Sequence, residues 1–421
     1  MFRFHLALLL TAVCATAGTT WHSVATNSEV PISVLEPSAN PGGDTTTAHV
    51  KQAPPVIIYL QNLPTPRVGT DSDESILHDF RAEGFLVVTL DYAHQSRARW
   101  PFINRDFTAL REQVQKKTFL DGRALDTLHI FIVPSGHRLK RDVVFYREAK
   151  RTLALDLIYP SHPAKPVGAV LEFSCDNKNR MSNFSLNFCT DTMLEGAATE
   201  GFAVAMADHP VPAPYAGLDA MPECAWKTKA AVRTLRAQSG ALGLNGRIVP
   251  VGFSRGSGMA LLLATTRSRA EFEGHGEHLG TDSSVQGAVV LSGRFTYLDL
   301  LANDKMIPRY NAAWGERATH EQRWRSQGAL DYLTAPTEPL FLSINCTESP
   351  DALHQMEVLR HRLTELSSPF EYHLDEEPRG HRVPLTPAVL DPMLSYLKRQ
   401  LASDPSIYFS HKEAPEGRKK G

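Results

Sequence analysis

The stretch RIVPVGFSRGSGMALLLATT, residues 247–266, changes its secondary-structure pattern at one serine. It begins with the apolar, β-branched run of a buried strand and ends with an apolar run of helical length. Between the two lies Gly252-Phe253-Ser254-Arg255-Gly256. In a tight turn from strand to helix, the side chains two residues before and two residues after the serine would collide, so glycine fits both positions. The turn predicts an α/β fold that raises the Ser254 hydroxyl above the edge of a sheet.

The position of Ser254 favours a role as a nucleophile. The backbone N–H of Arg255, at the start of the predicted helix, faces the place where an oxyanion would develop, with the positive end of the helix dipole behind it. A second interpretation is that the glycines only let the helix pack closely against the sheet.

A serine hydroxyl near neutral pH needs a base, usually histidine, and an acid that orients the base. Where the nucleophile lies on such a turn, the chain order is serine, acid, histidine. The best candidate base is His381, in the loop DEEPRGHRVP after the last predicted strand. Its rivals are His373, inside the predicted strand FEYHLD, and His354 and His361, on a predicted helix.

Two carboxylates follow the predicted strand PLFLSIN and precede His381. Glu348 is favoured as the acid because it lies closer to the end of that strand. Asp351 is the alternative acid. Asp351 also suits a purely structural role, as a carboxylate that complements the dipole at a helix N-terminus.

The pattern around the turn alternates strands with helices. RDVVFYREAKRTLALDLIYP, residues 141–160, predicts a hairpin. Further strands are predicted at 167–174, 202–210, 286–293, 339–346 and 370–375, and helices at 190–201, 223–243, 351–366 and 387–402. This order predicts a mainly parallel sheet with helices on both faces.

The chain divides by composition into five parts. Residues 1–17 are a predicted signal peptide, 18–53 a Ser-, Thr-, Pro- and Gly-rich linker, 54–135 an N-terminal α/β accessory module, 136–405 the catalytic domain and 406–421 a tail. In the accessory module, FRAEGFLVV echoes ATEGFAVAM of the later domain, and the module resembles a truncated half of the later sheet.

The N-terminus has the pattern of an export signal. Arg3 precedes a short apolar run, which Ala15-Thr16-Ala17 follows as a cleavage site. The apolar run is too short for a membrane anchor, and a lipid anchor on Cys14 is a weaker alternative. The sequence therefore predicts a secreted or periplasmic protein with no membrane span.

Four cysteines remain after the signal: Cys175, Cys189, Cys224 and Cys346. Export to an oxidising compartment favours disulfides, whose pairing the sequence does not fix. Buried free thiols are the alternative.

Composition excludes several classes of protein. Hydrophobic residues make up 42% of the 421 residues and charged residues 21%, the balance of a soluble globular protein. The net charge of −2, without a basic stripe, excludes nucleic acid as a partner. His275 and His278 lie among three glutamates, but the surrounding glycines favour a solvated loop over a metal site. Asp208 and His209 follow a strand end, where substrate contacts usually lie.

Residues 142–402 resemble the α/β-hydrolase family, especially the secreted esterase and dienelactone-hydrolase-like branch that includes feruloyl and acetyl esterases. The resemblance is carried by RTLALDLIYP, the turn with its flanks, PLFLSINCTESPDALHQ and GHR. It implies Ser254 as nucleophile, His381 as base, an acid within 348–351 and an oxyanion hole completed after VGAVLEFS. This chain has FSCDNKNR there in place of an H-G-G-G turn, which points to the backbone of Cys175 or Asp176.

These observations lead to a functional hypothesis. The expected reaction is hydrolysis of a carboxylic ester through an acyl-enzyme on Ser254, without an organic or metal cofactor. The expected substrate is a small-molecule ester or, from the resemblance, an acyl group on a polysaccharide. The alternatives are a prolyl-oligopeptidase-like serine peptidase and a non-catalytic binding protein on an inactive hydrolase scaffold.

Overall fold

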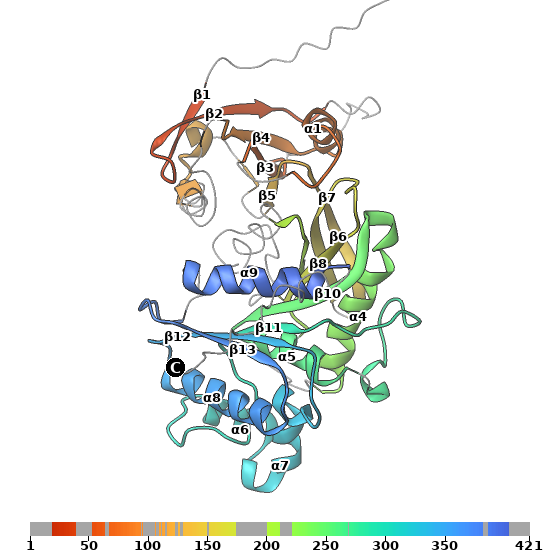
Figure 1. Cartoon of the computed structure of the whole chain (residues 1–421), viewed down its shortest axis with the longest axis vertical. Coiled ribbons are helices and arrows are strands. Elements are labelled where there is room, and N and C mark those ends of the chain that lie inside the picture. The colour runs from red at the N-terminus through yellow and green to blue at the C-terminus, as the bar shows by residue number, and fades with distance from the viewer. Residues whose placement is uncertain are drawn as a thin grey trace, which may run out of the picture.

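A computed structural model describes residues 19–38, 53–63, 67–93, 129–149, 151–173, 200–210, 221–267, 269–381 and 386–403, with scattered positions between 95 and 126. The predicted signal peptide, the predicted C-terminal tail, most of the predicted helix at 190–201, and Cys175, Asp176 and Cys189 lie outside these ranges. The described chain forms two sheets, shown one above the other in Figure 1.

The larger sheet has the strand order β13-β12-β11-β10-β8-β9-β7-β6. Strands β6 (His137–Arg147) and β7 (Thr152–Pro160) form the predicted antiparallel hairpin, and β7 also pairs antiparallel with β9 (Ala203–Ala207). The parallel strands are β8 (Val167–Phe173), β9, β10 (Leu244–Phe253), β11 (Ala288–Leu291), β12 (Leu340–Asn345) and β13 (Phe370–Asp375). A mainly parallel sheet was predicted, and the structure agrees.

Helices cover both faces of this sheet, because successive strand residues are buried on opposite sides. Val249 and Val251 of β10 share a core with α9 (Pro387–Leu401). Val290 of β11 and Leu342 of β12 share the opposite core with α5 (Arg255–Thr265) and α8 (Pro350–Glu365). Among the described residues, no helix combines the length and the apolar character that crossing a bilayer requires.

Among the described residues, the larger sheet is also accompanied by the helices α4 (Glu223–Ala237), α6 (Ile307–Trp314) and α7 (Arg317–Ser326), and by the short 3-10 turns η3 (Gly240–Leu242), η4 (Ala270–Phe272) and η5 (Ala329–Tyr332). A further 3-10 turn, η1 (Phe119–Gly122), precedes β6 and belongs to the part of the chain with the smaller sheet. Helices α6 and α7 lie between β11 and β12 in the chain, a stretch for which the sequence patterns predicted no element.

The smaller sheet has the order β1-β2-β4-β3-β5 and carries helix α1 (Asp73–Ala82). Its strands are β1 (Thr19–Ser23), β2 (Ser28–Leu35), β3 (Val56–Gln61), β4 (Leu86–Asp91) and β5 (Ile130–Pro134). The prediction of a linker over 18–53 is wrong for residues 19–35, which form β1 and β2. Only alternate residues of this hairpin are buried, among them Trp21, Val30 and Ile32, so its apolar content is low.

The smaller sheet repeats the first five strands of the larger one in order and direction. Each begins with an antiparallel hairpin, whose second strand pairs antiparallel with the fourth strand in the chain, and the third, fourth and fifth strands are parallel. Strand β5 therefore corresponds to β10. Ser135 follows β5 as Ser254 follows β10, but the chain then enters β6 and not a helix.

Asp71, just before α1, joins the two sheets. Its carboxylate accepts hydrogen bonds from Arg138 of β6 and from Ser161 and His162 after β7. The Arg138 contact measures 2.9 Å and the His162 contact 3.0 Å. The hydrogen bonds from Ser161 and Arg138 hold the pKa of Asp71 well below its ordinary value.

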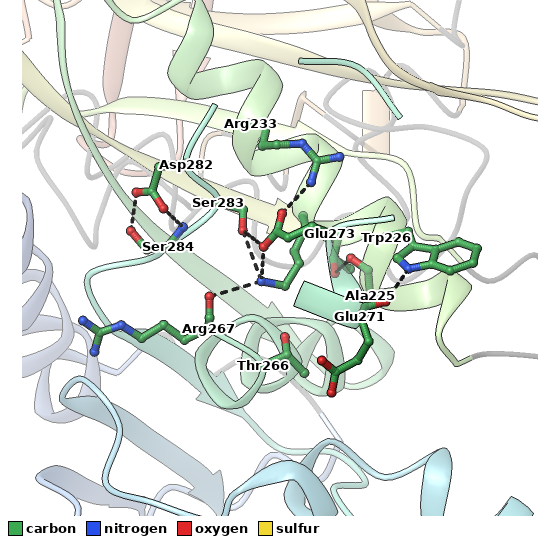
Figure 2. Close-up of polar contacts among 12 residues, drawn as sticks. Ala225, Trp226, Arg233, Thr266, Arg267, Glu271, Glu273, Asp282, Ser283 and Ser284 are labelled. Carbon is green, nitrogen blue, oxygen red and sulfur yellow. Dashed lines mark hydrogen bonds and ion pairs between the residues drawn. The ribbon is translucent and has the colours of Figure 1, made fainter. Parts of the chain in front are cut away.

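A second polar cluster holds the loop after α5 against α4. Figure 2 shows the Glu273 carboxylate next to Arg233 and Ser283. Glu273 pairs with Lys229 and Arg233 of α4 at 2.8 Å each, and both of these basic side chains are fully buried. Arg233 also donates to the backbone oxygens of His275 and Glu277. The segment with His275 and His278, predicted as a solvated loop, is therefore tied to α4 through its backbone.

Candidate active site

Ser254 occupies a strained backbone position at the junction of β10 and α5. Its φ of 55° and ψ of −118° lie where non-glycine residues rarely occur, at a cost of about 1–3 kcal/mol. Its N–H donates to the carbonyls of Leu291 and Ser292 at 3.2 and 3.1 Å. A Cβ on Gly252 would lie 2.1 Å from the backbone oxygen of Gly256, so the collision predicted for this turn is present.

His381 is the histidine that the fold brings to Ser254. Its Nε2 lies 2.9 Å from the Ser254 Oγ, although 127 residues separate them. Its ring lies against Phe253, with centroids 4.7 Å apart. The rival histidines lie elsewhere: His373 stacks on Phe341. The other two, His354 and His361, contact Asp299 and Glu365.

Glu348 holds the other nitrogen of the His381 ring. Its Oε2 lies 2.8 Å from His381 Nδ1 and accepts from the Ser292 hydroxyl at 3.0 Å, while its Oε1 accepts from the Ser349 N–H at 3.0 Å. Burial alone would raise the pKa of Glu348. The hydrogen bonds from His381, Ser349 and Ser292 outweigh burial and lower the pKa below its ordinary value, so the carboxylate is ionised near neutral pH.

Asp351, the alternative acid, lies apart from His381. It occupies the first turn of α8, where a carboxylate complements the helix dipole, and its Oδ2 lies 3.7 Å from Arg294. Helix α8 begins after Ser349, whose side chain accepts from the Ala352 N–H. The helix cap thus places Glu348 just outside the helix and Asp351 inside it.

The predicted oxyanion donors lie partly within the described chain. Arg255 is the first residue of α5, so its N–H lies at the helix start, next to Ser254. The side chain of Arg255 approaches His209, with Nη2 3.4 Å from Nδ1. Cys175 and Asp176, the other predicted donors, lie outside the described residues.

A cavity of 470 Å³ opens beside Ser254 and His381. Its lining combines α5, α6 and the segments that follow β9, β11 and β12; it includes His209, Met221, Cys224, Gly258, Met259, Leu262, Arg294, Tyr297, Met306, Tyr310, Trp314, Gln327 and Ala329. His209 was predicted to lie near this edge, and the structure places it in the lining. The wall from Tyr297 to Trp314 was missed, and the apolar positions of IPRYNAAW, spaced three and four apart, were the available signal.

Asp208 makes a hydrogen bond between strands, and two of the four cysteines are described as free thiols. The Asp208 carboxylate accepts from the Ala154 N–H at 2.9 Å and so joins β9 to β7. Cys224 and Cys346 are free thiols, and Cys224 contacts Met259 with 3.2 Å between the sulfur atoms. Burial raises the pKa of the Cys224 thiol to about 12.

The described residues contain no group of three or more His, Cys, Asp or Glu side chains that could hold a metal ion. His275, weighed as a ligand in the sequence, packs its ring edge-on against Trp226 with centroids 4.7 Å apart.

Comparisons with known proteins give matches in structure alone. No protein-family model matches the chain, and neither does any curated protein sequence. A truncated carbohydrate esterase from gut microbiota is similar with a TM-score of 0.52 at 15% identity, over 62% of this chain and 95% of that one. A bifunctional GH43-CE protein of Bacteroides eggerthii has a TM-score of 0.51 at 18% identity, over 62% of this chain and 38% of that one. The chain thus shares a fold with these proteins.

Proposed function

We propose that this chain is a serine hydrolase of the α/β-hydrolase fold that cleaves carboxylic esters through an acyl-enzyme on Ser254. One observation carries the proposal: a continuous chain of hydrogen-bond distances from the Ser254 hydroxyl through His381 to Glu348. A nucleophile, a base and an acid in this relation form the arrangement that activates serine in hydrolases on several unrelated folds.

The hydrogen-bond distances support the proton transfers that we propose for the reaction. With its proton on Nδ1, held by Glu348, His381 accepts the Ser254 proton at Nε2 while Oγ attacks the ester carbonyl carbon. The negative charge on the carbonyl oxygen meets the N–H of Arg255, and we assign the second donor to Cys175 or Asp176. As the C–O bond breaks, His381 passes its proton to the leaving alcohol. Water then attacks the acyl group with His381 again as base, which frees the acid and restores Ser254.

The proposed substrate class rests on the shared fold. One of the similar structures is described as a carbohydrate esterase and another as a bifunctional GH43-CE protein, and this chain shares their fold. We therefore propose an acyl group carried on a sugar or polysaccharide. The N-terminal pattern of residues 1–17 is the basis for proposing that the protein is exported.

A fluorophosphonate reagent tests the proposal directly, because it labels only an activated serine. We expect labelling of the wild-type protein and none of Ser254→Ala. Ser135→Ala is the matched control, since Ser135 follows the corresponding strand but hydrogen-bonds to Asp73, and it should label like the wild type. A folded wild-type protein that takes no label would favour the non-catalytic scaffold, and faster cleavage of peptide p-nitroanilides than of p-nitrophenyl esters would favour a peptidase.

A further inference from the structure

The cavity beside Ser254 has a solvent side and a buried side. The side chain of His381 is 50% exposed, whereas Leu262 and Trp314 on the inner wall are 3% exposed. The leaving alcohol must lie next to His381 Nε2, because this nitrogen returns the proton to it. The leaving group therefore lies at the solvent side, where a large alcohol such as a polysaccharide has room to extend.

The acyl group lies on the other side of the carbonyl carbon from the leaving group, which directs it to the buried side. We propose that the 470 Å³ cavity takes the acyl group of the ester, and that this group is apolar and larger than acetyl. The inference rests on the esterase function proposed above. The volume falls within the range of about 300–1,000 Å³ of pockets that enclose whole drug-sized ligands, so the two carbons of an acetyl group would leave most of it unfilled.

The chemistry of the inner wall suits an uncharged, apolar group. Thioether, thiol, aliphatic and aromatic side chains line much of the cavity: Met221, Cys224, Met259, Leu262, Tyr310 and Trp314. The polar side chains of His209, Arg255 and Gln327 line it as well. The guanidinium of Arg294 also reaches the cavity, but it is paired with the fully buried Asp304, with an Nη2 to Oδ1 distance of 2.9 Å. The pair is neutral overall, and its charges are already satisfied.

Gly258 supplies an independent argument that the space serves a ligand. Glycine inside a helix costs roughly 1 kcal/mol relative to alanine, so a helical glycine calls for a reason. At Gly256 the reason is packing, because a Cβ there would lie 2.5 Å from the Phe173 oxygen. At Gly258 the nearest atom, the Arg294 oxygen, would be 3.5 Å from a Cβ, which is ordinary contact. Since packing does not require glycine at 258, one turn after Ser254, its missing side chain keeps the cavity open.

A series of p-nitrophenyl esters tests the inference, because the leaving group is constant and only the acyl group changes. Each methylene that enters an apolar cavity is worth up to about fourfold in kcat/KM. We expect kcat/KM to rise by at least about tenfold from acetate to hexanoate, since four methylenes are added. An enzyme that labels at Ser254 but prefers acetate would overturn this inference alone; failure to label would overturn the proposed function.

A substitution at Gly258 locates the preference in this cavity. In Gly258→Leu, the new side chain occupies the space beside Ser254, so the ratio of hexanoate to acetate kcat/KM should fall about tenfold or more. Gly280→Leu is the matched control, because Gly280 has open space around it away from the cavity, and the ratio should stay unchanged. If Gly258→Leu does not fold, Gly258→Ala serves, with a smaller fall in the same ratio. An unchanged ratio in a folded Gly258 variant contradicts the assignment.

Discussion

Replacing Glu348 with glutamine should stop His381 from acting as a base, although glutamine has nearly the same shape as glutamate. Each oxygen of the carboxylate faces a donor: Oε1 faces the Ser349 N–H, and Oε2 faces His381 Nδ1 and the Ser292 hydroxyl. The Ser349 N–H can only donate, so the glutamine oxygen must take the Oε1 side. Its NH₂ group then points at His381 Nδ1, which has to become an acceptor.

The substitution changes the tautomer of the His381 imidazole, because a neutral ring carries its proton on only one of its two nitrogens. With Nδ1 accepting, the neutral imidazole carries its proton on Nε2, which lies 2.9 Å from Ser254 Oγ and can no longer accept the hydroxyl proton. A wrong tautomer of this kind lowers kcat by about 10⁴-fold in serine hydrolases, or about 5 kcal/mol of transition-state stabilisation. KM should change little, because Glu348 does not contact the substrate.

The assay is steady-state hydrolysis of p-nitrophenyl butyrate with the melting temperature measured in parallel. Asp351→Asn is the control, since its 3.7 Å contact with Arg294 lies outside this hydrogen-bond chain, and kcat should stay within about threefold of the wild type. Two results would contradict this prediction: a folded Glu348→Gln enzyme that keeps more than about a tenth of kcat, or an Asp351→Asn enzyme that loses as much kcat as Glu348→Gln.

Three further predictions concern the turn, the junction and a thiol. Gly256→Ala should lower both activity and the melting temperature, because its Cβ would lie 2.5 Å from the Phe173 oxygen; overpacking of this kind costs about 1–3 kcal/mol, and an unaltered protein would contradict the clash. Asp71 has a lowered pKa in the folded state, so its ion pair stabilises above the unfolded value of about 4 and loses this contribution as the pH falls below it. The difference in melting temperature between wild type and Asp71→Asn should therefore shrink from pH 7 to pH 3, and a constant difference would exclude the charge as its cause. Cys224, with its pKa raised to about 12, should resist iodoacetamide in the folded protein at pH 8 and react after unfolding, as mass spectrometry of peptides would show; rapid modification in the folded protein would disprove its burial.

The parts of the molecule that short patterns determine were predictable. The turn at Ser254 needs glycines at fixed offsets, and the parallel strands are buried on both faces, so both features leave a local signal. The preference for Glu348 over Asp351 came from its distance to a strand end. In the structure, the Ser349 cap places Asp351 within a helix, and Glu348 lies next to His381.

The parts that depend on distant residues were not predictable. The hairpin of β1 and β2 is buried on one side only, and its polar residues resemble a linker until β4 is known to lie beside it. The role of helix α6 in lining the cavity depends on residues from other parts of the chain, such as Leu262 and Ala329, which line the same cavity. Asp71 contacts Ser161 and His162, which lie about ninety positions away in the sequence, and no local sequence pattern predicts such a contact.

The repeated five-strand order creates a problem of recognition during folding. Strands β5 and β10 stand at the same place in the two equivalent five-strand sets, and each has an edge to which β11 could pair in parallel. In the described residues, β11 pairs with β10 and no strand pairs with the outer edge of β5. Loop closure favours the correct partner, since far less chain separates β11 from β10. An incorrect addition to β5 would produce a register in which Ser135 stood where Ser254 belongs. The short connection between β10 and β11 thus favours the correct strand pairing over pairing with the smaller sheet. A longer connection should increase the amount of misfolded, inactive protein.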